Sequence, residues 1–338
     1  MSLPPVTIVL SSFNGEKYVA DQIRSIQGQT HRHWKLLVRD DGSADRTVDI
    51  VQRLADRDSR IALLRDARGN LGPPASFGVL LEHALAGGAD YVALADQDDV
   101  WLPHKIACEL ELMLHREDQV GKTKPILIHT DLIVAGEDLR LVHPSYLAYE
   151  GLRHLDDSPL STLLIQNFVT GCTTLSNRAL LDAAVPIPTV IMHDWWLALC
   201  AAALGEIRHV PEPMVHYRQH GRNAMGSVGQ RRSLWRSLRN PIAAWLRADV
   251  VLDQVVEQAR ELAERVAREE RRSSAGRQSL QVLRDFCRAF SEGGGLTRLR
   301  VLSRHRIRPH TFSPYPVRFY ARVLFWSRTA HSPKGSMA

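Results

Sequence analysis

The chain has 338 residues, enough for a sizeable core and about two domains, and its 44% hydrophobic and 24% charged residues are typical of a globular protein. Its four cysteines lie far apart without a CxxC pair, which argues against a zinc site or a disulfide scaffold and favours a reducing compartment. No apolar run approaches the ~20 residues of a transmembrane helix, and the start lacks the basic region of a signal peptide, so we expect a cytoplasmic protein.

The net charge of +6 is unevenly distributed. Residues 226–338 carry 22 Lys+Arg and 9 Asp+Glu, whereas residues 1–225 carry 21 Lys+Arg and 28 Asp+Glu. Such asymmetry indicates an anionic partner for the C-terminal part: a membrane surface, a nucleic acid or a phosphorylated lipid.

Strands and helices alternate through the first hundred residues. We predict strands at 6–10, 34–38, 61–64 and 91–95, with helices at about 16–27, 45–55 and 75–86. This alternation indicates βαβ units and a parallel sheet, in which ligands bind beyond the carboxyl ends of the strands.

Further strands and helices follow. We predict strands at 126–135, 168–175, 208–210 and 214–218, and helices at about 160–167, 177–184, 193–204, 243–272 and 279–290, with a loop at 293–295. The chain therefore divides into an α/β domain at 1–225 and a basic, mainly helical region at 226–338.

An acidic cluster follows the strand at 91–95: Asp96, Asp98 and Asp99. Buried carboxylates are costly unless paired or metal-bound, so the cluster suggests Mg²⁺ or Mn²⁺ bound through oxygen. Asp96 and Asp98 are two positions apart and can face the same way, whereas Asp99 points elsewhere. The alternative is a solvated acidic loop, or the N-cap of a helix that begins near residue 102.

Polar clusters also end the first two strands, at residues 11–16 and 40–43. A ligand with a hydrogen-bonding ring, a ribose and phosphates would use all three clusters. Carboxylates accept from base N–H and ribose hydroxyl groups, helix N-termini suit phosphate oxygens, and a carboxylate-held metal neutralises a diphosphate.

In this order and spacing the motifs resemble family 2 glycosyltransferases of GT-A fold, over about residues 5–225. The matching segments are VTIVLSSFNG at 6–15, DDGSADRT at 40–47, NLG at 70–72 and DQD at 96–98. The resemblance implies a Rossmann-like, mixed and mostly parallel sheet flanked by helices.

A subgroup is more similar still: bacterial rhamnosyltransferases that build O-antigen and related surface polysaccharides. The matching segments are ADQDDVW at 95–101, GCT at 171–173, HDWW at 193–196 and YRQHGRN at 217–223. The resemblance implies inverting, metal-dependent transfer of rhamnose from dTDP-rhamnose to a glycan acceptor, with a UDP-sugar as the alternative donor.

The resemblance also implies roles for individual residues. The nucleotide-sugar contacts would be Ser11, Phe13, Asn14, Glu16, Asp41, Asn70, Gly72, Asp96 and Arg218. Asp41 would accept from the N–H of uracil or thymine. Mg²⁺ or Mn²⁺ would be held by Asp96, Asp98 and His220, although His220 could equally be a diphosphate contact or a plain surface histidine, and Asp99 a ligand or a helix cap.

Asp194 matches the general base of the family, which many members place in a Glu-Asp pair. Here His193 replaces that glutamate. A free aspartate is a poor base, but burial beside Trp195 and Trp196 would raise its pKa. The alternative role for Asp194 is the N-cap of the following helix.

The basic region mixes arginines with large apolar side chains. Arg231, Arg232, Arg236 and Arg239 interleave with Leu234, Trp235, Leu238 and Trp245, and the arginines of 298–308 precede Phe312, Tyr315, Phe319, Tyr320, Phe325 and Trp326. This pattern suggests a helix on an anionic leaflet, peripheral at the inner face of the cell membrane, which suits a polyprenyl-diphosphate-linked acceptor. The alternative is that these helices pack on the catalytic domain with their arginines solvated.

Three other functions fit less well. A sugar-nucleotide pyrophosphorylase needs a G-x-G-T-R type phosphate loop, which residues 11–15 lack. A nucleic-acid-binding protein is disfavoured because no helix-turn-helix, zinc or RNA-binding signature occurs, so nucleic acid is not an expected partner. A non-catalytic sensor would not require Asp96, Asp98 and Asp194 together.

Overall fold

The computed structural model describes residues 3–155, 157–221, 241–273, 276–310 and 315–326. The side chains of 241–248, 272, 273, 315, 316 and 318 are not described. The predicted arginine–apolar stretch at 231–239 lies outside the described residues, as do Arg222, Asn223 and Phe312, and the side chains of Trp245 and Tyr315.

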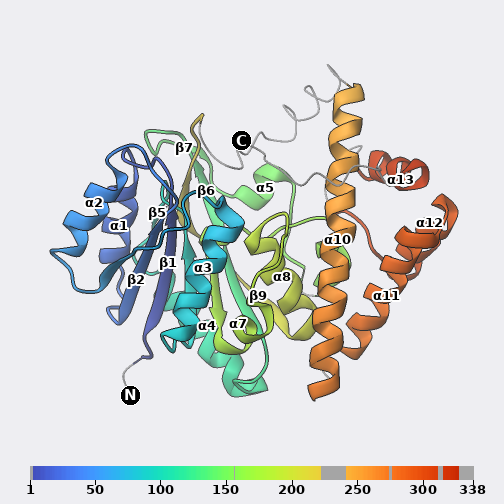
Figure 1. Ribbon diagram of the computed structural model, residues 1–338, viewed down its shortest axis with the longest axis horizontal. Helices are drawn as coiled ribbons and strands as arrows, with labels where there is room; N and C mark the ends of the chain where they lie inside the picture. Colours follow the sequence, from blue (N-terminus) through green and yellow to red (C-terminus); the bar gives the residue numbers. More distant parts are fainter. Residues whose placement is uncertain (1–2, 156, 222–240, 274–275, 311–314, 327–338) are drawn as a thin grey trace.

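A nine-stranded sheet forms the centre of the molecule, in the order β3-β2-β1-β4-β8-β6-β9-β5, with β7 paired to β6 (Figure 1). Its strands are β1 (Val6–Ser12), β2 (Trp34–Asp40), β3 (Ile61–Leu64), β4 (Tyr91–Ala95), β5 (Val100–Trp101), β6 (Ile126–Ala135), β7 (Leu141–His143), β8 (Thr174–Asn177) and β9 (Glu206–Arg218). β1 to β4 are mutually parallel, β8 runs antiparallel between β4 and β6, and β9 is parallel to β6. The predicted mixed, mostly parallel sheet is confirmed.

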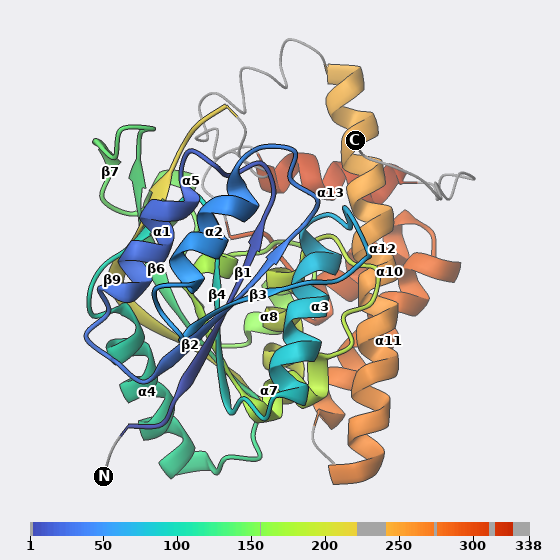
Figure 2. The same ribbon diagram turned by 60° about the vertical axis from the view of Figure 1, so that its left-hand side comes forward.

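Helices cover both faces of the sheet (Figures 1 and 2). In the first two thirds of the chain they are α1 (Val19–Gln27), α2 (Thr47–Ala55), α3 (Pro73–Ala86), α4 (Lys105–Val120), α5 (Tyr146–Glu150), α6 (Pro159–Leu163), α7 (Arg178–Ala184) and α8 (His193–Leu204). Successive side chains of β1 enter different cores: Ile8 packs with α1 and α4, whereas Val9 packs with α3 and α8. This alternation follows from the two-residue repeat of a strand that is buried on both faces.

Three predicted stretches differ in the structure, and β5, β7, α5, α12 (Gly295–Arg304) and α13 (Tyr315–Phe325) were not predicted. The strand predicted at 168–175 is replaced by a 3₁₀ turn at Gly171–Thr173 followed by β8, and the helix predicted at 160–167 ends at Leu163. The two strands predicted at 208–210 and 214–218 are one strand, β9, whose register against β6 shifts near Asp131 where Pro213 is its partner. Proline lacks the N–H of a ladder bond, which explains the irregularity.

The C-terminal region is helical, as predicted: α10 (Pro241–Ser273), α11 (Arg277–Glu292), α12 (Gly295–Arg304) and α13 (Tyr315–Phe325). These helices complete the burial of α8. Eleven of its twelve residues are buried, and the sheet can cover only one side of it. One buried cluster joins Trp196 and Leu199 of α8 to Leu262 of α10 and Phe286 of α11, on both sides of the predicted boundary at 225/226. In the part of the chain that is described, no helix has the length and apolar character needed to span a bilayer.

Because this core is continuous, we expect Leu262→Ala, at a fully buried position of α10, to lower the free energy of unfolding by about 2–5 kcal/mol and to shift the whole transition. Calorimetry with circular dichroism measures both quantities. The control is Val251→Ala on the same helix, where the side chain is 47% exposed and the expected loss is under about 1 kcal/mol. A separate transition that moves alone would show that the C-terminal helices fold as an independent unit.

Candidate active site

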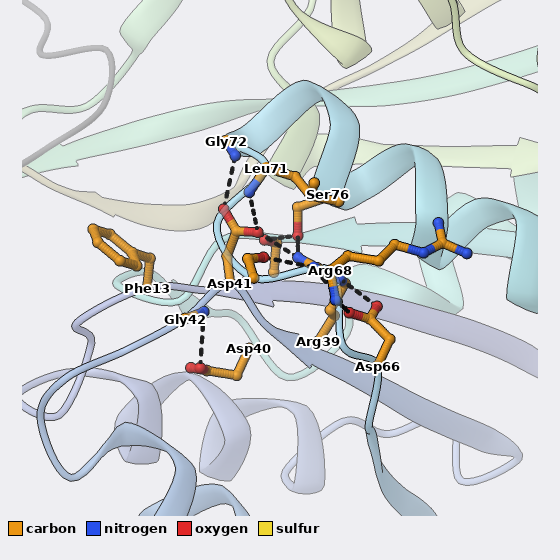
Figure 3. Close-up of polar contacts among 12 residues, drawn as sticks. Phe13, Arg39, Asp40, Asp41, Gly42, Asp66, Arg68, Leu71, Gly72 and Ser76 are labelled. Atoms are coloured by element: carbon orange, nitrogen blue, oxygen red, sulfur yellow. Dashed lines mark hydrogen bonds and ion pairs between the residues drawn. The ribbon is translucent and has the colours of Figure 1, made fainter. Parts of the chain in front are cut away.

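Asp41 follows β2 and is held from three directions (Figure 3). Its Oδ1 accepts from Arg39 Nη1 and from the backbone N–H of Leu71 at 2.9 Å, and its Oδ2 accepts from the N–H of Gly72 at 2.8 Å. Gly72 has a φ of +76° at the N-terminus of α3, a conformation that favours glycine. The carboxylate is buried, and Oδ2 retains one free acceptor direction.

The buried side chain of Arg39 connects the residues around Asp41. Its guanidinium is 1% exposed and donates to Asp66 through Nε at 2.8 Å and to Ser76 Oγ through Nη1 at 2.9 Å. Ser76 Oγ also lies 2.6 Å from Ser11 Oγ on β1. β1, β2 and α3 are therefore locked together around Asp41, so its orientation is fixed before any ligand arrives.

Asn14 and Glu16 use their side chains to bind the next loop. Asn14 Oδ1 accepts from Ala44 N at 2.9 Å, and Glu16 Oε2 accepts from Arg46 N at 3.3 Å and Arg46 Nε at 3.2 Å. These contacts join the loop after β1 to the loop after β2. A direct contact of either residue with a nucleotide stays a prediction.

Phe13 is tied to the loop after β4 through its backbone. Gln97 Oε1 accepts from Phe13 N at 2.9 Å and Gln97 Nε2 donates to Phe13 O at 3.0 Å, while the ring itself is 45% exposed. Asn70 is also exposed, on the loop before α3. An exposed ring on a fixed backbone is suited to stacking against a planar base.

Asp98 pairs with His220, which follows β9. The distance from Asp98 Oδ2 to His220 Nε2 is 2.8 Å, and the ring of His220 stacks on Tyr18 with centroids 4.7 Å apart. Arg218 lies beside them, donating through Nε to Asp98 O at 2.9 Å and through its backbone N–H to Asp99 Oδ1 at 3.2 Å. The structure thus brings three of the predicted site residues, Asp98, Arg218 and His220, into contact.

Asp96 lies on the inner side of the same loop, near Asp99 and Cys172 of the 3₁₀ turn. One carboxylate oxygen of each aspartate and the Cys172 sulfur lie within 4.8 Å of one another. Burial, together with the charges of Asp98 and Asp194, raises the pKa of Asp96 to about 7. Among the described residues Asp99 Oδ2 is buried without a hydrogen-bond partner.

These observations fit a divalent cation. Mutually repelling, partly buried carboxylates are stabilised by a positive charge, and carboxylate oxygen with imidazole nitrogen suits Mn²⁺ or Mg²⁺. Among the described residues the groups that lie within reach of one ion are Asp96, Asp99 and Cys172, whereas Asp98 and His220 form a pair of their own, so Asp96, Asp98 and His220 as the ligand set stays a prediction. Asp99 is too deeply buried to act as a solvated loop residue, with 0% exposure.

Asp194 lies at the first turn of α8, facing the 3₁₀ turn. Its Oδ2 accepts from Gly171 N at 3.0 Å, and its Oδ1 accepts from Trp195 N at 2.6 Å and from Asn167 Nδ2 at 3.4 Å. Burial raises the pKa of the carboxyl to about 6, although these hydrogen bonds oppose the shift. A side chain at residue 171 would come within 3.1 Å of His193 Nε2, so the glycine is what permits this close approach.

His193 is buried beside Asp194, and its ring stacks on Phe77 of α3 with centroids 3.9 Å apart. Neither ring nitrogen has a hydrogen-bond partner among the described residues. Burial lowers the pKa of His193 to about 3, so the imidazole is neutral at physiological pH. Trp195 and Trp196 turn away from the site and donate to backbone carbonyls of Leu163 and Ala184.

Several site residues were not predicted from the sequence: Arg39, Asp66, Ser76 and Asn167. Gly171 was recognised only as part of the GCT motif, without a role. Arg39 is the penultimate residue of β2, and a charge next to the apolar run that ends at Val38 is the one sequence signal that could have drawn attention to it. The others are ordinary loop or helix-start residues whose contacts arise only in three dimensions.

Comparison with known proteins agrees with this geometry. Residues 7–126 match the family model described as glycosyl transferase family 2. The crystal structure of S. aureus TarS 1–349 in complex with UDP-GlcNAc superposes with a TM-score of 0.54 at 16% identity, covering 89% of this chain and 80% of that one. The family model thus covers the first part of the chain, residues 7–126, and the superposition shows the GT-A fold that the motifs predicted.

Two curated relatives add sequence similarity. The putative teichuronic acid biosynthesis glycosyltransferase TuaG of Bacillus subtilis is 31% identical over 174 residues, which cover 51% of this chain and 61% of TuaG. WfgD of Escherichia coli, named as a UDP-Glc:alpha-D-GlcNAc-diphosphoundecaprenol beta-1,3-glucosyltransferase, is 29% identical over 197 residues, 57% of this chain and 68% of WfgD. The chain thus spans less than two thirds of the length of TuaG.

If Asp98 is a metal ligand, Asp98→Asn is expected to weaken Mn²⁺-dependent binding of UDP or dTDP by about 10–100-fold, because an amide oxygen carries no full negative charge. Isothermal titration calorimetry with and without Mn²⁺ measures the affinity for UDP or dTDP. Asp49→Asn, at an exposed carboxylate of α2, is the matched control. Equal affinities in all three proteins would remove Asp98 from the metal site.

Proposed function

We propose that this protein is an inverting, metal-dependent glycosyltransferase that moves a sugar from a nucleoside diphosphate sugar to a lipid-linked glycan acceptor in cell-surface polysaccharide synthesis. The observation that carries the proposal is the position of Asp194. Its buried carboxylate accepts from the backbone N–H of Gly171, and the sulfur of the next residue, Cys172, lies within 4.8 Å of carboxylate oxygens of Asp96 and Asp99. A base with a raised pKa beside a candidate cation site is the combination that inverting transfer requires.

The reaction is a single displacement. The acceptor hydroxyl attacks the anomeric carbon as the bond from that carbon to the diphosphate oxygen breaks, and Asp194 takes the hydroxyl proton. A bound divalent cation would neutralise the charge that develops on the departing diphosphate. The backbone N–H groups of Gly171 and Trp195 hold the carboxylate in place while it receives the proton.

Asp194 is a better base than its neighbour. His193, which stands where many family members have glutamate, has a pKa lowered to about 3, so it holds a proton far more weakly than Asp194 with a pKa near 6. The imidazole is instead a neutral group whose ring nitrogens can hydrogen-bond a sugar hydroxyl. The replacement of glutamate therefore supports Asp194 as the single base.

Asp41 and Phe13 support a pyrimidine nucleotide. The free acceptor direction of Asp41 Oδ2 suits the ring N–H that uracil and thymine share, and the exposed Phe13 ring offers a stacking surface. We propose dTDP-rhamnose as the donor, from the rhamnosyltransferase-like motifs at 95–101 and 193–196. A UDP-sugar is the second candidate, because WfgD is named for UDP-Glc and the TarS structure is a complex with UDP-GlcNAc.

A thermal-shift panel tests the donor: dTDP-rhamnose, UDP-glucose and UDP-GlcNAc, each with and without Mn²⁺. We expect the largest Mn²⁺-dependent rise in melting temperature with dTDP-rhamnose, because a ligand that binds only the folded state stabilises it. Stabilisation by UDP-sugars alone would show that the donor is a UDP-sugar and not dTDP-rhamnose. No response to any nucleotide sugar would refute the glycosyltransferase proposal itself.

The base is tested by Asp194→Asn, which we expect to bind donor normally and to lose transfer by at least about 100-fold. In the wild type, transfer should fall about tenfold for each pH unit below the pKa of Asp194, because only the ionised carboxylate accepts a proton. That pKa is about 6, and a neighbouring cation would lower it, so the inflection should lie at or below pH 6. Turnover unchanged in the asparagine variant would exclude Asp194 as the base.

A further inference from the structure

We propose that α12 and α13, with the segment that follows α12, form a surface that docks on an anionic lipid bilayer. This docking surface consists of the exposed side chains of Leu296, Arg300, Arg304, Arg306, Arg308, Val317 and Phe325. It goes beyond the transfer reaction, because it concerns where the enzyme meets its acceptor.

α13 packs one face on the protein and exposes large apolar side chains on another. Its Val323 is 0% exposed and its Arg322 is 5% exposed and pairs with Asp249 of α10, whereas Val317 is 72% and Phe325 71% exposed. These two are the most exposed large apolar side chains of the described residues, and they lie eight positions apart, on one face of the helix. Exposed apolar side chains on a helix that already buries another face favour an apolar partner.

α12 continues the surface with one apolar residue and a row of arginines. Leu296 is 66% exposed, and Arg300 and Arg304 follow it at four-residue spacing on the same exposed face. α12 begins against the end of α13, because a side chain at Gly295 would overlap the carbonyl oxygen of Leu324. Leu296 and Phe325 therefore lie next to the point where the backbones of α12 and α13 meet, and both side chains are exposed.

The sequence from the end of α11 onward carries charge of one sign, although Asp249 and Asp285 of the neighbouring helices pair with Arg322 and His305. The last 46 residues, 293–338, contain eight arginines, one lysine and no aspartate or glutamate. Apolar side chains flanked by cations are the pattern of a surface that lies in the headgroup region of an anionic leaflet. A nucleic acid would also attract arginines, but it gives exposed valine and leucine nothing to bury against, so the bilayer is favoured.

The segment that follows α12 forms hydrogen bonds with the part of the chain that contains Asn167, which donates a hydrogen bond to Asp194. The carbonyl of His305 accepts from Ser161 Oγ at 3.0 Å, and His310 N donates to Gln166 Oε1 at 2.8 Å. Asn167, the next residue, donates to Asp194. Figures 1 and 2 both place α13 at the end of the molecule toward which β1 runs, which is also the end of the candidate active site. A bilayer on this surface would bring a lipid-linked acceptor close to Asp194.

Co-sedimentation with vesicles tests the surface, using phosphatidylcholine alone or mixed with phosphatidylglycerol. We expect the full chain to bind only the anionic vesicles. Val317→Asp with Phe325→Asp, and separately Arg300→Glu with Arg304→Glu, should each weaken binding by at least about tenfold. Because all four side chains are exposed, the melting temperature should not change.

Matched controls carry the same changes elsewhere. Leu141→Asp with Val142→Asp alters exposed apolar residues of β7, and Arg53→Glu with Arg57→Glu alters exposed arginines at α2. Both should bind vesicles within about twofold of the wild type. No binding to anionic vesicles, equal losses in the controls, or tighter binding to RNA than to vesicles would overturn the proposal. Nucleotide binding is measured separately from vesicle binding, so a failure of the docking proposal can be distinguished from a failure of the proposed reaction.

Discussion

Repulsion between carboxylates at one end of the sheet is the constraint around which this molecule is arranged. Asp96, Asp98 and Asp99 follow β4, and the start of α8 adds Asp194 to the same space. The cost is visible in the pKa of Asp96, which burial and the charges of Asp98 and Asp194 raise to about 7, whereas burial alone raises the pKa of Asp194 to about 6. A fold selected for stability alone would not gather these groups. A divalent cation beside these carboxylates would offset the repulsion, in keeping with the proposed reaction.

The part of the site that is local in sequence could be predicted, and the part that depends on packing could not. The loops after β1, β2 and β4 are short stretches that follow apolar strands, so their meeting at one sheet edge follows from the parallel arrangement alone. Cys172 could not be placed from sequence, because the strand predicted at 168–175 would have pointed its side chains alternately to both faces. The 3₁₀ turn instead aims Cys172 at the aspartates and Gly171 at Asp194.

α8 shows how a helix can be predicted correctly while its surroundings remain hidden. Its sequence, HDWWLALCAAAL, is apolar on every side, which already implies cover on every side. The sequence does not show that this cover comes from α10 and α11, which begin more than thirty residues later in the chain. The burial of α8 has a direct effect on chemistry, because the same packing removes Asp194 and His193 from water and moves their pKa values in opposite directions.

The C-terminal region does more than bury α8. α10 and α11 bury α8, and the chain beyond them returns to bond Ser161 and Gln166, next to Asn167. The carboxylate of Asp194, the proposed base, is thus held between two structures that the same C-terminal region supports: the helix that carries it and the loop that donates to it. If α12 and α13 dock on a bilayer as proposed, the hydrogen bonds of His305 and His310 would connect the docked surface to the loop beside Asp194.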